Sequence, residues 1–268
     1  MILFILEGQS EERIAKTIQK LYFEERKGDI IYSYRNNIYQ LYDRLVAERE
    51  GFESFEGAVD ILRILKEKNP ADKTLHAIED VSDIEETYLF FDYDFQHAIK
   101  QHEKNPSKTL DECIIENNRK IREMLDFFNE ETEMGRLFVN YPMVESLFYT
   151  KTLPDDNYKS YNVDFATCQN NGFKRLVNKI SAYKNRAPII ITKHSKISED
   201  EVKENWELLK VQNIAKANAI ITGEYKQPAT KDGILQDKIF DAQESMYAAT
   251  NHIGVLNSFP LFLYYYFK

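Results

Sequence analysis

The sequence predicts an α/β protein: a mainly parallel sheet flanked by helices, followed by a mostly helical C-terminal domain. Three observations favour this class. Short apolar runs alternate with amphipathic stretches over roughly the first half of the chain, as βαβ units require. These runs are apolar on both faces, as strands of a covered parallel sheet are. After a stretch at 152–162 in which Pro, Asp and Asn cluster into a loop, the pattern becomes mainly helical.

The first part of the chain contains the expected strands and the helices between them. The apolar runs that read as strands lie at 2–6, 29–34, 87–94 and 136–141. The amphipathic stretches that read as helices lie at 10–23, 37–50, 55–68 and 110–130. Ser10 is the expected N-cap of the first helix, because Ser often precedes an apolar helical pattern.

The second part is expected to be helical and to form a separate domain. Its helical patterns lie at 173–184, 199–220 and 231–251. The apolar run at 187–192 fits either a strand or a buried helix turn. The aromatic tail at 259–267 is expected to pack into the protein. We therefore expect one domain over residues 1–152 and another over residues 153–268.

Composition narrows the classes of function. The formal net charge of -9 gives no general attraction to nucleic acid or anionic membrane. Cys113 and Cys168 lack ligand-like spacing, which argues against a disulfide scaffold or a zinc site and suits a reducing cytoplasm. The apolar runs at 2–6 and 259–267 are too short for a signal-peptide core or a membrane span. We expect a cytoplasmic protein without a membrane association.

Acidic side chains follow three of the predicted strands. Glu7 comes directly after the first strand, with Glu11 one helical turn further on. Asp92 and Asp94 end the third strand, and Glu145 follows the fourth. Because the carboxyl ends of parallel strands share one edge of the sheet, these acids are expected to gather there. Asp92 and Asp94 are two apart, so in an extended segment they point to one side.

Gathered carboxylates repel each other, and a divalent cation removes that conflict. Oxygen ligands without His or Cys suit Mg²⁺ or Mn²⁺. Such a cation activates water and stabilises charge on a phosphoryl group, which points to phosphodiester cleavage or phosphoryl transfer. The alternative is structural, since acids commonly end strands and cap helices.

The segments "LEGQSEE" and "FFDYD", each placed after an apolar strand, resemble the signature of the TOPRIM domain. The segment "FVNYPMVES" is similar to the S-N-P-x-x-E stretch of TOPRIM-like proteins of the OLD and RloB types, with Tyr141 standing between Asn140 and Pro142. Many of those proteins act in bacterial anti-phage defence or abortive infection. The resemblance covers about the first 150 residues.

The resemblance implies a role for each acid. Glu7 would be the acid nearest the metal or the general base, and Asp92 and Asp94 would be Mg²⁺ ligands. Glu11 and Glu145 would complete the ligand shell or bind a second ion. A lysine near the metals assists the transition state in OLD-type nucleases, and Lys193 is the candidate here. His194 beside it is a candidate acid or base.

A basic stretch lies within this acidic chain. Lysine and arginine recur between residues 174 and 196, and a local basic face of this kind can contact phosphates. The residues are Lys174, Arg175, Lys179, Lys184, Arg186, Lys193 and Lys196. The alternative is a solvated helix face.

Together with the acidic strand ends, the resemblance implies a Mg²⁺-dependent nuclease that cleaves DNA or a structured RNA such as tRNA, as a toxic effector in anti-phage defence. The alternative is a non-catalytic TOPRIM-like interaction module that works with an ATPase. This ATPase would be a separate protein, because the chain carries no P-loop. Phosphoryl chemistry on a small nucleotide and assembly into a homo-oligomer both stay open.

Overall fold

The structure, a computed structural model, describes residues 1–23, 30–48, 58–129, 135–180, 188–191 and 197–267. The described chain separates into two compact units. The first comprises residues 1–91 and 119–138, and the second comprises residues 92–118 and 139–268. This division differs from the boundary expected after residue 152. The chain leaves the first unit at the end of its third strand, returns along a helix, and leaves again within the fourth strand.

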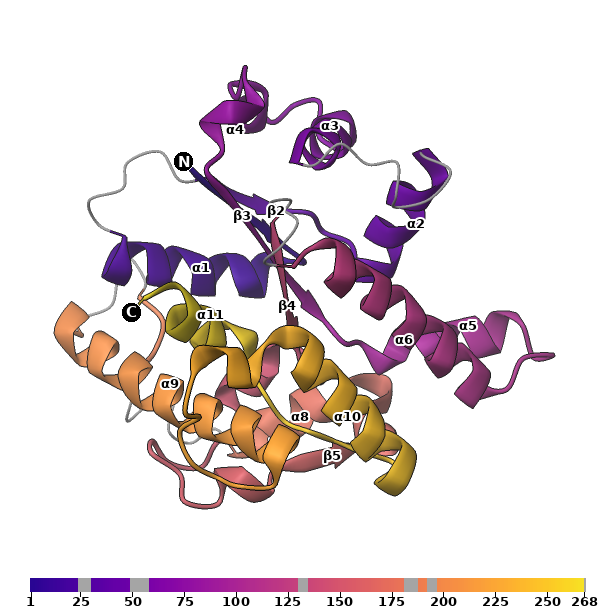
Figure 1. Ribbon diagram of the computed structural model, residues 1–268, viewed down its shortest axis with the longest axis vertical. Coiled ribbons are helices and arrows are strands. Elements are labelled where there is room, and N and C mark those ends of the chain that lie inside the picture. The colour runs from indigo at the N-terminus through magenta and orange to yellow at the C-terminus, as the bar shows by residue number, and fades with distance from the viewer. Residues whose placement is uncertain (24–29, 49–57, 130–134, 181–187, 192–196, 268) are drawn as a thin grey trace. The chain divides into compact units, whose positions relative to one another are not determined.

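The first unit is built on a parallel sheet (Figure 1). Its strands are β1 (Ile2–Leu6), β2 (Ile30–Ser33), β3 (Glu86–Asp92) and β4 (Arg136–Asn140). These four strands of the described chain lie in the order β2-β1-β3-β4, and β1 pairs in parallel with both of its neighbours. Leu6 is aligned with Ser33 on one side and with Phe90 on the other. The expected α/β class with a parallel sheet is confirmed.

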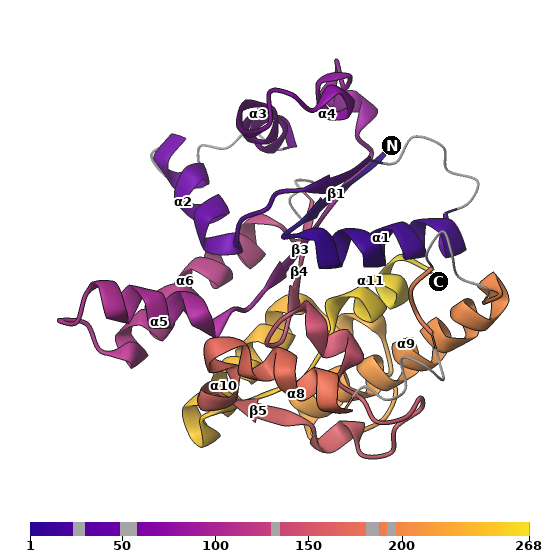
Figure 2. The ribbon, with the colours of Figure 1, turned by 180° about the vertical axis from the view of Figure 1, so that it is seen from behind.

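Helices cover both faces of this sheet. They are α1 (Gln9–Tyr22), α2 (Ile38–Glu48), α3 (Ala58–Lys68), α4 (Lys73–His76) and the second half of α6 (Leu110–Phe127). The chain moves in opposite directions from β1 to β2 and from β2 to β3. Right-handed crossovers therefore place α1 on one face and α2 to α4 on the other. Figures 1 and 2 show the strands between α1 and α3.

The first helix starts earlier than expected. It begins at Gln9, and Gly8 is the N-cap, so the expectation that Ser10 caps this helix is wrong. The backbone of Gly8 is extended, and its carbonyl oxygen accepts the first helical hydrogen bond, from the N–H of Glu12 at 3.1 Å. The chain thus enters the helix directly after Glu7. The expected apolar face is confirmed, since Ile14, Ile18 and Leu21 are buried.

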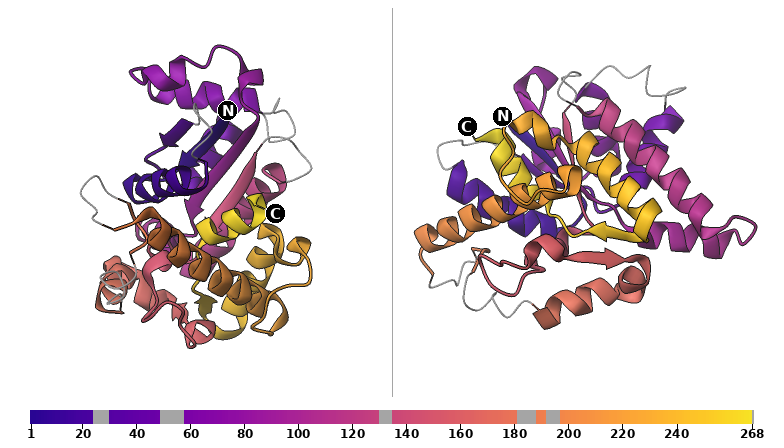
Figure 3. Two further views of the ribbon diagram at one scale, coloured as in Figure 1. Left: turned by 90° about the vertical axis from the view of Figure 1, so that its left-hand side faces the viewer. Right: turned by 60° about the horizontal axis from the view of Figure 1, so that its bottom comes forward.

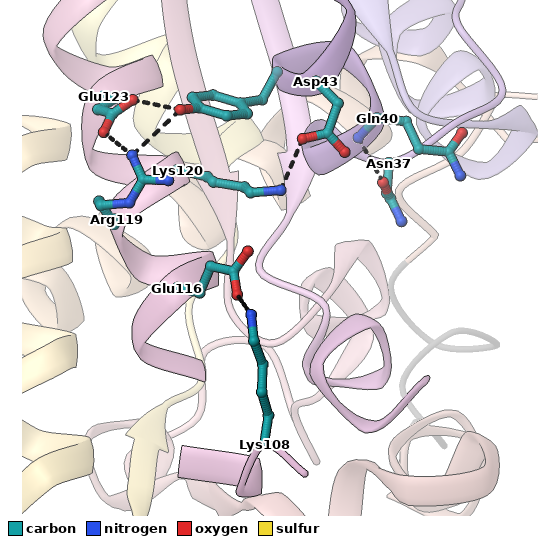
Figure 4. Close-up of polar contacts among 9 residues, drawn as sticks. Asn37, Gln40, Asp43, Lys108, Glu116, Arg119, Lys120 and Glu123 are labelled. Carbon is teal, nitrogen blue, oxygen red and sulfur yellow. Dashed lines mark hydrogen bonds and ion pairs between the residues drawn. The ribbon is translucent and has the colours of Figure 1, made fainter. Parts of the chain in front are cut away.

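A polar cluster fastens α6 to α2 within the first unit (Figure 4). The Tyr42 hydroxyl donates to Glu123 Oε2 at 2.6 Å, and Arg119 pairs with Glu123 one turn away on α6. Lys120 Nζ lies 2.7 Å from Asp43 Oδ1 and 5.3 Å from the centre of the Tyr42 ring. Burial and the hydrogen bond with Glu123 raise the pKa of Tyr42, and Arg119 opposes them. These contacts hold α6 on the face that α2 covers.

The second unit is mainly helical, as predicted (Figure 3). Its α-helices are α5 (Phe95–Lys104), the first half of α6, α7 (Phe165–Cys168), α8 (Gly172–Ile180), α9 (Glu199–Thr222), α10 (Gln236–Thr250) and α11 (Ser258–Tyr266). It also contains a small antiparallel pair that the sequence did not predict, β5 (Asn162–Asp164) and β6 (His252–Gly254). Within the described ranges, no helix has both the length and the apolar character needed to cross a bilayer.

The core of the second unit combines apolar and polar contacts. Trp206 of α9 and Phe259 and Phe262 of α11 are buried, so the aromatic tail packs into the protein as predicted. Residues 188–191 form neither of the elements considered for them, although Ile189 is buried. The buried Lys216 donates to three oxygens of the segment before and at the start of β5, namely Lys159 O, Tyr161 O and Asn162 Oδ1.

Candidate functional site

The end of β1 presents two acidic side chains of the first unit. Glu7 follows the last strand residue and is partly exposed. Glu11, in the first turn of α1, is buried. A Cβ atom added to Gly8 would lie 3.4 Å from Glu11 Oε2, so the Glu11 carboxylate lies close over the glycine. A negative charge here is favourable at the positive end of the helix.

The end of β3 places Asp92 beside Asn140, the last residue of β4. The Asn140 side chain donates from Nδ2 to Asp92 Oδ1 at 3.1 Å. The backbone N–H groups of the next two residues, Tyr93 and Asp94, donate to the carbonyl oxygens of Asn140 and Pro142. The segment that follows β3 thus stays joined to the segment that follows β4, and Asp92 is held at this junction.

Asp94 departs from the extended conformation expected for it. Its φ of 44° and ψ of 75° are left-handed, and its carboxylate caps α5 by accepting the N–H of Gln96 at 3.1 Å. The expectation that an extended strand presents Asp92 and Asp94 together is therefore wrong. Burial raises the pKa of Asp94, and the Gln96 hydrogen bond and the charges of Lys100 and Lys174 oppose that rise.

Glu145 lies in the short 3₁₀ helix η3 (Val144–Phe148), and it forms an ion pair with a residue predicted to bind nucleic acid. Lys174 Nζ, near the start of α8, lies 3.0 Å from Glu145 Oε1. The other carboxylate oxygen, Oε2, is buried, and among the described residues no hydrogen-bond donor reaches it. A carboxylate oxygen of this kind is a ready acceptor for a cation.

The remaining basic candidates divide into two groups. Arg175 and Lys179 are exposed on α8, and Arg175 donates from Nη1 to the carbonyl oxygen of Asn170 at 2.7 Å. The others lie outside the described residues. They are Lys184, Arg186, Lys193 and Lys196, together with His194.

The predicted acids are distributed over the two units and have different partners. Glu11 lies against the glycine that follows Glu7 in the first unit. In the second unit, Asp92 contacts Asn140, Asp94 caps a helix, and Glu145 pairs with Lys174. Within the described ranges, no three Asp, Glu, His or Cys side chains are grouped so that they could hold a metal ion.

The chemistry of the donors nevertheless suits a hard divalent cation. All five predicted ligands are carboxylates, and Oε2 of Glu145 is a buried oxygen to which no described group donates. Mg²⁺ binds proteins through one or two carboxylates while keeping several waters, so it does not need a closed cage of protein ligands. Of these predicted ligands, Glu7 and Glu11 belong to the first unit, and Asp92, Asp94 and Glu145 belong to the second.

The sequence indicated no separate role for Asn140, which was noted only as part of the segment "FVNYPMVES". This residue is fully buried and uses both ends of its amide. Its Oδ1 accepts from the backbone N–H of Ser258 at 3.0 Å and from the Ser258 hydroxyl at 2.8 Å. The signal was an amide between apolar neighbours in "LFVNYP", since a buried polar side chain must find partners.

None of the family models, curated proteins or solved structures compared with this chain matches it. The fold itself defines an α/β protein with parallel strands, in which Glu7 follows β1 and Asp92 is the last residue of β3.

Proposed function

We propose that this protein is a Mg²⁺-dependent nuclease of the TOPRIM-like kind, acting on DNA or a structured RNA such as tRNA. One observation carries the proposal. β1 and β3 are parallel neighbours, with Leu6 aligned with Phe90. Glu7 directly follows β1, and Asp92 is the last residue of β3. In parallel α/β sheets, ligands bind beyond the carboxyl ends of the strands. Acidic residues at these ends suit phosphoryl chemistry assisted by a metal.

The proposed chemistry assigns a task to each part of the site. A bound Mg²⁺ would supply positive charge for the scissile phosphate and lower the pKa of an attacking water. Glu7 accepts the proton of that water, and Asn140 keeps the Asp92 carboxylate in one orientation. Basic side chains of the 174–196 stretch, Lys193 among them, hold the phosphate backbone and stabilise developing negative charge.

The wider role belongs to the same proposal. A nuclease of this kind would work in the bacterial cytoplasm as a toxic effector against phage, with a separate ATPase partner to restrain or activate it. Reduced cell growth on expression of the wild-type chain, relieved by Asp92→Asn, supports that role.

Cleavage assays test the proposal. Purified wild type, Glu7→Gln and Asp92→Asn are incubated with supercoiled plasmid and with tRNA in Mg²⁺ or Mn²⁺. Loss of a metal ligand is expected to lower the rate by at least about 100-fold, since even supporting residues contribute up to that much. The matched controls Glu103→Gln and Asp126→Asn change exposed acids and should cleave as the wild type does. Equal cleavage by all five proteins contradicts the proposal.

A non-catalytic interaction module is the second candidate. The observation that favours it is that Asp92, Asp94 and Glu145 all have protein partners, which acids with purely structural roles would also have. Calorimetric titration with Mn²⁺ separates the two candidates. Heat of binding that Asp92→Asn abolishes supports the nuclease, and no binding by the wild type supports the module.

A further inference from the structure

The ion pair between Glu145 and Lys174 joins two elements of the second unit. Glu145 belongs to η3 and Lys174 to α8, and these elements contact each other. The Lys174 side chain is 48% exposed and that of Glu145 is 19% exposed. The lysine therefore reaches from solvent to a largely buried carboxylate.

The two oxygens of this carboxylate have different environments. Oε1 lies 3.0 Å from the Lys174 ammonium. Oε2 is buried, and no donor among the described residues reaches it. A buried acceptor without a donor is unfavourable, so a second cationic or donor group at Glu145 would stabilise it. Glu145 thus already pairs with one cation through Oε1, and its Oε2 is an acceptor for a second one.

We propose that the Lys174 ammonium is an internal counter-cation that competes with Mg²⁺ for Glu145, so that metal binding displaces it from the carboxylate. This inference rests on the proposed function, because it concerns the same acids. A half-exposed ion pair contributes little to stability, and a doubly charged ion can replace it. Once displaced, Lys174 is available to a phosphate, which is the role that the sequence predicts for it.

The test measures metal binding rather than cleavage. MnCl₂ is titrated calorimetrically into the full chain as wild type, Lys174→Met, Lys174→Arg and Lys203→Met. Removing the competing charge should tighten Mn²⁺ binding by about two- to fivefold, which is the range that exposed ion pairs contribute. Lys174→Arg keeps the charge and should bind Mn²⁺ with nearly wild-type affinity. Lys203→Met, which removes an exposed charge from another helix of the second unit, should do the same.

A double variant shows whether the effect passes through Glu145. In a Glu145→Gln background, Lys174→Met is expected to leave Mn²⁺ affinity unchanged. The carboxylate for which Lys174 and the metal compete is then absent. If the wild type binds Mn²⁺ and Lys174→Met binds no more tightly, the competition is excluded while the proposed nuclease stands. If neither protein binds Mn²⁺, the proposed function fails and the competition fails with it. The charge-preserving Lys174→Arg variant guards against an effect of lost folding.

Discussion

The side-chain amide of Asn140 donates to Asp92 at 3.1 Å while its oxygen accepts two hydrogen bonds from Ser258. A fully buried amide thus fixes an acid at the end of a strand, and the start of α11 fixes the amide. Because all of the donors and acceptors on Asn140 have defined directions, the Asp92 carboxylate has little freedom to turn.

Asn140→Asp should destabilise the protein strongly. The substitution replaces a donor with a second carboxylate facing Asp92, so a hydrogen bond becomes a repulsion in a buried place. We expect the free energy of unfolding to fall by roughly 2–4 kcal/mol in urea denaturation at neutral pH. Asn178→Asp makes the same change at an exposed position of α8 and should have little effect. Equal stability of the two variants would contradict the role given to Asn140.

Asp94→Asn should separate stability from metal binding. Asparagine accepts the same hydrogen bond from Gln96 and tolerates the left-handed backbone. Burial raises the pKa of Asp94, which means that the folded protein disfavours its charged form. The variant should therefore be at least as stable as the wild type at neutral pH in the presence of EDTA, yet bind Mn²⁺ more weakly. Asp94→Ala should lose about 1 kcal/mol with the cap, which thermal unfolding can measure.

Lys216 should make stability depend on alkaline pH. Burial lowers its pKa from 10.5 to about 8 in the folded chain. Between these values the unfolded chain keeps a proton that the folded chain has released, so stability rises with pH across this window and the gain is lost as pH falls through about 8. The contribution amounts to roughly 3 kcal/mol at full extent.

Lys216→Met removes this dependence along with three hydrogen bonds. Urea denaturation below and above the window should therefore show a stability difference from the wild type that grows with pH. Lys203→Met changes an exposed lysine of the same helix and should leave the wild-type profile intact. A difference between wild type and Lys216→Met that does not change with pH would contradict the assignment.

Tyr42→Phe should loosen the attachment of α6 to α2. It removes the hydroxyl that donates to Glu123 at 2.6 Å and accepts from Arg119 at 3.3 Å, while the ring stays. We expect a loss of about 1 kcal/mol in the free energy of unfolding. Tyr264, on α11, has a partly exposed ring, and Tyr264→Phe is the control with a small effect. An unchanged unfolding midpoint for Tyr42→Phe would show that this hydroxyl does not contribute.

The sequence predicted the elements that have strong periodicity. The apolar run from Ile2 to Leu6 and the run ending at Asp92 are strands, and the helical spacing of Ile14, Ile18 and Leu21 marks a buried face. The two strands are almost continuously buried apolar runs, and the buried face of α1 repeats every three to four residues. β5 and β6 have three residues each and were missed, because so short a strand carries no periodic signal.

The candidate site was predicted less completely because its contacts join distant parts of the chain. The residue types at Glu145 and Lys174 were noted, but their pairing depends on how η3 packs against α8. The left-handed backbone of Asp94 depends on where α5 begins, and helix boundaries are poorly marked in a sequence. The placement of Asp92 by Asn140 likewise needed the tertiary structure.

The link between Asn140 and Ser258 also has a consequence in time. Ser258 lies 118 residues after Asn140, so the ribosome adds it long after Asp92 has been made. Until then the Asn140 amide lacks the Ser258 groups that orient it. In a nascent chain that stops before Ser258, Asn140 would therefore not hold the Asp92 carboxylate in its orientation. For a protein proposed to cut nucleic acid, such late completion would protect the translating cell from unfinished copies.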